Sequence, residues 1–322
     1  MFKTIPAPVY TYKCDEYIPN CLLFDSINQL LYTGTQTGEI LTWNLETNRQ
    51  KSKTKAGKQC ILKLELLTTK NLLISQNKLG EIQFWLINKY NLSNIHTITT
   101  QVIGFCKFVL YDNDLILCKS DKEKYVMNFF SIHNYEKVKT FNPNDSTLGD
   151  LMVIKCVKNY IFCAYESCKI IIWLEDKIDE TAEFPDVECL MALDIDSNIT
   201  KGVCAGSSDT IYSFQVINNK ICLKKSIKIT NPGISELCLR SDNKLIAAVC
   251  WDFNVRIFSW KTMKLLALLD SHSNGVLDVT FSKSLITFWK TEYLLAIACK
   301  DCKITLWNIY NDKSNIITNK II

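Results

Sequence analysis

One pattern recurs seven times along this chain and restricts its fold more than any other feature. Each copy is an apolar run of strand length, a short polar turn, an apolar residue and, three residues later, a large aromatic residue. The first copy reads LLYTGTQTGEILTW and the last reads LLAIACKDCKITLW. Two apolar runs joined by Gly, Asn, Asp, Ser or Lys are typical of paired strands, so each copy predicts a β-hairpin. The seven aromatic residues, called landmarks below, are Trp43, Trp85, Phe130, Trp173, Phe214, Phe258 and Trp307.

The spacing of the landmarks predicts how the hairpins are assembled. Successive landmarks lie 41 to 49 residues apart, which is close to the ~40–45-residue period of a four-stranded propeller blade. A single four-stranded sheet cannot bury both of its faces, whereas a ring of such sheets buries both and leaves only short edges. No segment longer than about ten residues has helical periodicity between turn signals. The sequence therefore predicts an all-β fold.

We expect residues 1–322 to form a single seven-bladed β-propeller, closed by an N-terminal strand in blade 7. The seventh hairpin has no outer strand after it, and Val9–Lys13 alternates in the manner of a strand ahead of the first hairpin. Pairing of this segment with the last hairpin would join two distant parts of the chain. The blade hairpins are predicted to end near residues 43, 85, 130, 173, 214, 258 and 307.

Composition and charge argue against several function classes. The net charge of +4 over 322 residues is small, whereas nucleic-acid binding would need a concentrated basic face. No apolar run approaches the ~18–20 residues of a membrane span, and the first residues contain prolines but no apolar run like that of a signal peptide. We therefore expect a protein of the cytosol or nucleus that binds neither nucleic acid nor membrane.

The fifteen cysteines are expected to be reduced core residues, because there is no export signal and most lie in apolar strand patterns. Cys299 and Cys302 have the CxxC spacing of a zinc or redox pair, but they occupy a hairpin turn and no second pair exists. The chain has no nucleophile elbow and no glycine-rich phosphate loop. We therefore predict no enzyme activity, no catalytic residue, no cofactor and no metal.

The hairpins resemble the WD repeat, whose signature is a Gly-His pair, an Asp in the hairpin turn and Trp-Asp at the end. Asp252 and Asp301 each stand six residues before a landmark, where the turn Asp belongs, and His272 is the only residue resembling the His of that pair. We interpret His272 as a structural partner of Asp301 and Asp252 as a turn cap. Most copies lack these residues, so we expect the hydrogen-bonded tetrad of the repeat to be largely absent and packing to replace it.

A narrower resemblance covers the C-terminal third. Thr230–Ser273 and Leu294–Tyr310 resemble the guanine nucleotide-binding protein subunit beta-like protein 1 family, whose fungal member is ASTRA-associated protein 1, in runs such as Thr-Asn-Pro-Gly-Ile and Val-Arg-Ile-Phe. The resemblance implies a non-enzymatic adaptor for the Tel–Tti co-chaperone and RuvB-like ATPases. Through them it implies a role in the stability of phosphatidylinositol-3-kinase-related kinases and in DNA-damage signalling.

We expect this adaptor to be a monomer within a larger complex of proteins. A G-protein γ subunit is not expected among its partners. The β subunits that bind γ carry a long N-terminal helix, whereas here Pro6 and Pro8 would break such a helix.

Two segments are candidates for partner binding. TNPGISE (230–236) contains a Pro-Gly turn beside the sixth hairpin, whose Trp and Arg are residue types typical of binding hot spots. A purely structural role is the alternative. SKSLITFWKTEY (282–293) lengthens the last spacing, and its two aromatic residues either form a contact patch or fold onto blade 7. The candidate residues are Asn231, Pro232, Glu236, Trp251, Arg256, Phe288 and Trp289.

Three further interpretations concern charge and the ring axis. The basic run Arg49–Lys58 is interpreted as a solvated outer strand whose lysines discourage edge pairing. A reader of peptide tails such as those of histones stays open as an alternative function, and it would need an aromatic cage or an acidic pocket at the axial mouth. A propeller enzyme would need carboxylates or histidines that converge at the axis.

Overall fold

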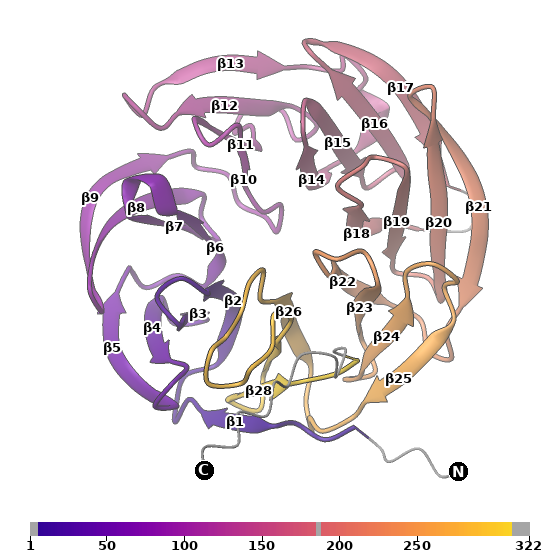
Figure 1. The fold of residues 1–322 in the computed structure, drawn as a ribbon. Helices are drawn as coiled ribbons and strands as arrows, with labels where there is room; N and C mark the ends of the chain where they lie inside the picture. The colour runs from indigo at the N-terminus through magenta and orange to yellow at the C-terminus, as the bar shows by residue number, and fades with distance from the viewer. Residues whose placement is uncertain (1–5, 185–187, 311–322) are drawn as a thin grey trace, which may run out of the picture.

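Seven four-stranded sheets stand around a central axis in the computed structural model, which describes residues 6–184 and 188–310 (Figure 1). All neighbouring strands within a sheet are antiparallel, and each blade runs from an innermost strand at the axis to an outer strand at the periphery. The predicted fold class, a seven-bladed β-propeller, is confirmed.

The strands of the first four blades follow one another along the chain. From the axis outward, they are β2 (Pro19–Asp25), β3 (Leu30–Thr35), β4 (Glu39–Asn44) and β5 (Arg49–Lys55) in blade 1; β6 (Ile61–Leu67), β7 (Leu72–Asn77), β8 (Glu81–Asn88) and β9 (Asn91–Thr99) in blade 2; β10 (Val109–Tyr111), β11 (Leu115–Lys119), β12 (Met127–Ser131) and β13 (Lys137–Phe141) in blade 3; and β14 (Leu151–Val157), β15 (Tyr160–Tyr165), β16 (Lys169–Leu174) and β17 (Lys177–Glu183) in blade 4.

Blades 5 and 6 repeat this order, and blade 7 takes its outer strand from the start of the chain. The strands are β18 (Leu190–Ile195), β19 (Lys201–Gly206), β20 (Thr210–Ile217) and β21 (Lys220–Lys228) in blade 5; β22 (Ile234–Leu239), β23 (Leu245–Cys250), β24 (Val255–Ser259) and β25 (Leu265–Leu269) in blade 6; and β26 (Val276–Phe281), β27 (Leu295–Cys299), β28 (Lys303–Trp307) and β1 (Tyr10–Lys13) in blade 7.

Helical structure in the described residues is limited to two short 3₁₀ turns, η1 (Thr68–Lys70) and η2 (Ser146–Leu148). Within those residues there is no helix with the length and apolar character needed to cross a bilayer. The basic run forms β5, and its lysines are exposed on the outer edge of blade 1 as predicted.

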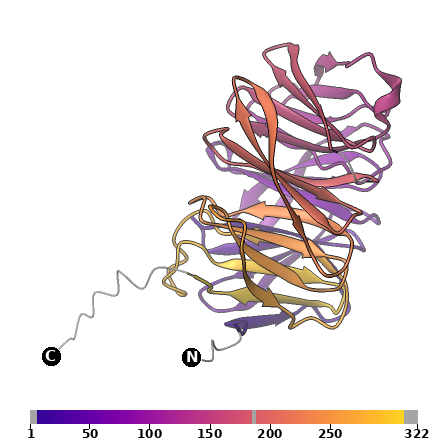
Figure 2. The same cartoon turned by 90° about the vertical axis from the view of Figure 1, so that its right-hand side faces the viewer.

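The ring is closed by β1, as predicted from the alternation of Val9–Lys13. Tyr10 pairs with Leu306 and Lys13 with Lys303 in an antiparallel register, and the Val9 amide donates to the Leu306 carbonyl at 2.7 Å. Figure 2 shows β1 in indigo beside the yellow strands of blade 7. Closure therefore depends on residues from opposite ends of the sequence.

The hydrophobic core is divided among the gaps between neighbouring blades, and each of the seven gaps holds its own cluster of buried side chains. In the gap between blades 7 and 1, Tyr12 and Leu306 face Leu31 and Trp43. Each sheet thus buries one face against each neighbour, which is why no blade is stable alone.

The landmarks mark a β-bulge in six of the seven blades. The register between the third and fourth strands shifts immediately before the landmark, and such a shift increases the local twist. Blade 7, whose fourth strand is β1, has no shift over its paired residues. The bulged landmarks are Trp43, Trp85, Phe130, Trp173, Phe214 and Phe258.

Candidate functional site

A backbone hydrogen bond that recurs in six blades holds one residue of each blade at the same face of the ring. In six blades the first residue after the second strand donates its backbone N–H to the carbonyl just before the innermost strand, at 2.8–3.2 Å. These bonds all lie on one face of the ring, which carries the turns between second and third strands and is called the rim face below. The donors, called rim positions, are Gln36, Lys78, Glu166, Ser207, Trp251 and Lys300.

Trp251 is the rim position of blade 6, and its side chain is 49% exposed. Its ring lies against Gly233, where a Cβ would come within 2.1 Å of the indole. The same glycine has a φ of +97°, a region that other residues rarely adopt. Phe253, in the same turn, is 46% exposed. The rim therefore presents two exposed aromatic side chains, and the ring of Trp251 lies on a backbone position that favours glycine.

Polar contacts beneath these rings hold the turn in place. The two terminal nitrogens of the Arg256 guanidinium donate to the Asp252 carboxylate, at 2.9 and 2.7 Å, and Asn231 donates to it at 3.0 Å. Burial alone would raise the pKa of Asp252, but these hydrogen bonds outweigh burial and hold its pKa well below the usual range. Asp252 also accepts from the Asn254 amide at 3.3 Å, which is the turn-cap role predicted for it.

This geometry separates the candidate partner-binding residues of the first segment. Arg256 is only 5% exposed and its guanidinium is bound to Asp252, so its structural role is established and its contact with a partner stays a prediction. Asn231 and Pro232 are exposed beside Trp251. Glu236 does not join them, because it lies on the innermost strand β22 and faces the axial channel.

Within that channel a lysine joins carboxylates from distant blades. Lys107, just before blade 3, lies 2.5 Å from Glu236 in blade 6 and 3.5 Å from Asp278 in blade 7. Asp278 in turn accepts the Leu22 amide of blade 1 at 2.7 Å. Burial lowers the pKa of Lys107, but the two carboxylates outweigh burial and the pKa is raised. No motif or spacing in the sequence indicates this group, which links four blades across the axis.

Replacing Lys107 with alanine is expected to reduce the free energy of unfolding by about 1–3 kcal/mol at neutral pH, since it leaves two facing carboxylates without their cation. This cost is smaller than that of breaking a fully buried ion pair, because Lys107 and Glu236 keep about a third of their side-chain surface open to the channel. Burial already raises the pKa of Asp278, and removal of Lys107 raises it further. A carboxyl group whose pKa is raised in the folded state stabilises the folded protein increasingly as the pH falls.

The deficit of Lys107→Ala relative to wild type is therefore expected to shrink between pH 7 and about pH 5. Urea unfolding at the two pH values measures this. In an Asp278→Asn background the same substitution should cost less. A deficit that is equal at both pH values and in both backgrounds would contradict the electrostatic role.

The insertion 282–293 docks on blade 1. Gln29, in the first turn of that blade, donates to the Leu285 carbonyl at 3.1 Å and accepts the Thr287 amide at 2.7 Å. Trp289 packs against the core between blades 7 and 1, whereas Phe288 is 53% exposed. Trp289 thus folds onto the core, whereas Phe288 has the exposure that a contact patch needs. The functional role of Phe288 stays a prediction.

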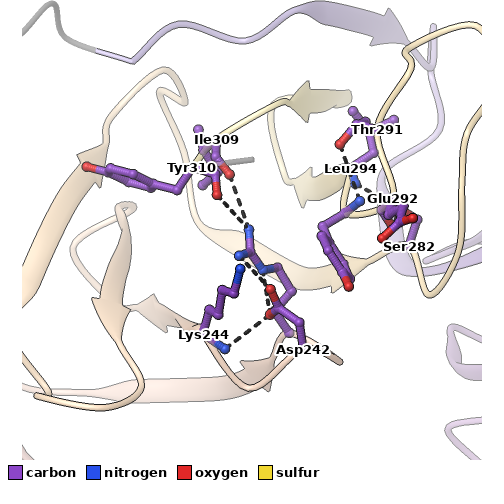
Figure 3. A network of polar contacts seen from close by, with 10 residues as sticks. Asp242, Lys244, Ser282, Thr291, Glu292, Leu294, Ile309 and Tyr310 are labelled. Atoms are coloured by element: carbon purple, nitrogen blue, oxygen red, sulfur yellow. Dashed lines mark hydrogen bonds and ion pairs between the residues drawn. The ribbon is translucent and has the colours of Figure 1, made fainter. Parts of the chain in front are cut away.

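Polar contacts also fix both ends of the insertion (Figure 3). Ser282 accepts the Leu294 amide at 2.8 Å and donates to the Glu292 carbonyl at 2.9 Å. Nearby, the buried Arg240 forms an ion pair with Asp242 at 2.9 Å.

The insertion connects the first strand of blade 7 to the second. Because neighbouring strands are antiparallel, it lies on the face opposite the rim face. The two candidate segments therefore do not form one surface.

His272 is at the centre of a buried hydrogen-bond relay in blade 7. Its Nδ1 lies 3.0 Å from Asp301 Oδ2 and its Nε2 lies 2.8 Å from Thr305 Oγ1. Thr305 also accepts from Trp307 Nε1 at 2.9 Å. The predicted pairing of His272 with Asp301 is present. Blade 7 is the exception to the expected general absence of the tetrad, because Thr305 supplies the hydroxyl that completes it.

Other blades keep only part of the relay. Trp43 donates to Thr33 at 3.1 Å and Trp85 donates to Ser75 at 2.9 Å, each without a histidine. The buried indole N–H of Trp173 has no hydrogen-bond partner among the described residues. In these blades packing does replace the network.

His272, Cys299 and Asp301 bring three possible metal-ligand atoms within 4.8 Å of one another. Each atom is already in use. Both His272 nitrogens have partners, and the Cys299 thiol donates to the Asn274 carbonyl at 3.2 Å. Burial raises the pKa of Cys299 to about 12, whereas metal binding needs a thiolate. The arrangement fits a hydrogen-bonded turn, in which Cys302 follows Asp301 with a φ of +59°, better than a metal centre.

The fold and the landmark pattern first define a class, the seven-bladed β-propellers that WD-repeat proteins form. No protein-family model matches the chain. It is 26% identical to guanine nucleotide-binding protein subunit beta-like protein 1 of Mus musculus, over 96% of this chain and 98% of that protein. It is 22% identical to ASTRA-associated protein 1 of Schizosaccharomyces pombe, over 95% of this chain and 100% of that protein.

A WD repeat-containing protein 91 homolog of Dictyostelium discoideum is 31% identical over 47% of this chain and 20% of that protein. The resemblance inferred from the C-terminal third is therefore confirmed, and it extends over nearly the whole chain. Propellers of this class are typically non-catalytic scaffolds for other proteins.

Proposed function

We propose that this chain is a non-catalytic adaptor in an ASTRA-type assembly and that it binds a protein partner on its rim face. The observation that carries the proposal is the pair of exposed rings, Trp251 and Phe253, on a turn fixed by Gly233 and by the ion pair below it. An ordered aromatic pair loses little conformational entropy on binding, and tryptophan is the residue type most enriched in hot spots.

The finer part of the proposal comes from the resemblance. The adaptor would work as a monomer within a larger complex, in the cytosol or nucleus, with the Tel–Tti co-chaperone and RuvB-like ATPases. It would support the stability of phosphatidylinositol-3-kinase-related kinases and, through them, DNA-damage signalling. The support for this is the full-length similarity to ASTRA-associated protein 1.

The double variant Trp251→Ser/Phe253→Asn is expected to weaken partner association by at least about thirtyfold, the equivalent of a hot-spot loss of about 2 kcal/mol. Asparagine is chosen at position 253 because φ there is +68°, which asparagine tolerates. Affinity purification of tagged protein from intact cells, with quantitative mass spectrometry of Tel–Tti and RuvB-like components, measures the effect.

The matched control is Leu223→Ser/Leu265→Ser, which removes two similarly exposed apolar side chains from the outer strands β21 and β25. The control should keep its partners. Recovery of neither component with the wild-type chain would count against the assembly proposed, and equal recovery with both double variants would count against the rim. Arg256 is avoided as a test residue, since its removal would leave Asp252 buried and unpaired.

A further inference from the structure

The axial channel consists of two cavities that open on opposite faces of the ring. One, of about 540 Å³, opens on the rim face and is lined by the rim positions Gln36, Lys78 and Lys300. The other, of about 520 Å³, opens on the far face beside Asn113 and Lys283. All seven blades contribute to the first cavity, called the rim cavity below. It exists only because the ring is closed.

The two cavities differ in charge. The lining of the rim cavity includes five lysines and a single carboxylate, that of Glu236. The far cavity has four lysines and four carboxylates, those of Glu65, Asp194, Glu236 and Asp278. The reason is that three lysines shared by both cavities find counterions toward the far side. The rim-cavity lysines are Lys63, Lys78, Lys107, Lys155 and Lys300.

These ion pairs leave the mouth of the rim cavity positive. Lys63 pairs with Glu65 at 3.2 Å and Lys155 pairs with Asp194 at 2.7 Å, so the deeper lysines are compensated. Lys78 and Lys300, at the mouth, are exposed, and no ion pair joins either of them to a carboxylate in the described part of the chain. Two uncompensated ammonium groups thus flank an opening through which a ligand would enter.

The rim cavity also has an apolar wall. The ring of Phe105, 65% exposed, stands at its edge with the Lys78 ammonium 5.0 Å from its centroid. A cation over an aromatic face leaves the other face of the ring free for a ligand. The remaining apolar lining comes from the innermost strands or the residues just beside them and includes Leu62, Phe108, Met152, Met191 and Leu277.

We propose that the rim cavity binds an acidic peptide segment, with carboxylates or phosphates held by Lys78 and Lys300 and a neighbouring apolar side chain seated against Phe105 and the methionines. Complementary charge around a concave apolar pocket is the arrangement that selects such a ligand. The same lysines disfavour a cationic histone tail. The inference goes beyond the rim contact of Trp251, and neither site depends on the other.

A peptide fits these observations better than a nucleic acid does. On the side of blades 3 and 4 the rim carries Glu166 at a rim position and Asp150 beside it, each paired with a lysine of blade 3. An extended polyanion lying across the mouth would therefore meet carboxylates on that side, and the two lysines beside them are already paired. A short segment entering the cavity would not, and its apolar side chain would fill space that a phosphate backbone cannot use.

The test uses the purified full-length chain and a fluorescein-labelled synthetic peptide of glutamate and aspartate with one central phenylalanine, followed by fluorescence anisotropy. Wild type should bind it with an affinity that falls as salt rises. Lys78→Glu/Lys300→Glu should weaken binding at least about tenfold. Both lysines are exposed, so the variant should fold, and its thermal unfolding confirms this.

The matched control is Lys137→Glu/Lys224→Glu, which makes the same change in net charge on the exposed outer strands β13 and β21. It should bind as wild type does. The proposal is overturned by no binding of the peptide to wild type, by equal weakening in both double variants, by loss of the central phenylalanine having no effect, or by tighter binding of a single-stranded oligonucleotide of equal charge. Partner recovery by the Trp251 variant is scored separately, so either proposal can fail alone.

Discussion

Replacement of Tyr12 with alanine is expected to lower the free energy of unfolding by about 3–5 kcal/mol, the range for loss of a buried aromatic side chain. Tyr12 is buried in the closing strand β1, where its ring lies 4.8 Å from that of Trp43. Its hydroxyl donates to Asn48 Oδ1 at 3.0 Å. One side chain thus ties the outer strand of blade 7 to blade 1, and its loss weakens the closure on which every other blade interface depends.

Urea unfolding followed by tryptophan fluorescence measures this effect, and two variants of the same strand separate its causes. Tyr12→Phe keeps the packing and loses one hydrogen bond, so it should cost about 1 kcal/mol. Thr11→Ala changes an exposed residue of β1 and should fall within about 0.5 kcal/mol of wild type. If Tyr12→Ala were no more costly than Thr11→Ala, the strand would contribute little to closing the ring.

Replacement of His272 with alanine is expected to cost about 2–4 kcal/mol, because it leaves Asp301 and Thr305 buried without a shared partner. Burial raises the pKa of Asp301, but the interaction with His272, chiefly its hydrogen bond, outweighs burial and the pKa is lowered. A carboxylate with a lowered folded-state pKa contributes stability above its unfolded-state pKa, and this contribution is lost as the pH falls through the folded-state pKa.

The difference between wild type and His272→Ala should therefore be largest near neutral pH and should narrow below about pH 4. His133→Ala is the control, since His133 is exposed and meets Asp114 at the surface. It should change stability by no more than about 0.5 kcal/mol. Thermal and urea unfolding across the pH range measure both variants. Equal costs for the two histidines would show that the relay is not a special source of stability.

Both predictions concern blade 7, where the ring is closed. Blade 7 is the blade whose strands come from both ends of the chain, and it is also the blade with the complete relay. The insertion adds a third tie there, through Gln29 of blade 1. Blade 7, where chain connectivity does not hold the ring together, thus has three separate ties to itself and to blade 1.

The sequence by itself determined the blades, their order and the strand that closes them. Hairpins bring together residues that lie close along the chain, so apolar alternation and a repeated aromatic residue are enough to recognise them. The resemblance to the WD repeat placed Asp252 in its turn, six residues before a landmark, and paired His272 with Asp301.

Only the tertiary structure decided what surrounds the axis. Lys107, Glu236 and Asp278 stand on or beside innermost strands of three blades, where the alternation of polar and apolar residues is like that of any solvent-facing strand. Their contacts, and the positive mouth formed by Lys78 and Lys300, depend on how many blades close the ring and on how each strand is rotated. The burial of Arg256 likewise depends on the path of a neighbouring loop. Such positions follow from ring geometry, which no short stretch of sequence contains.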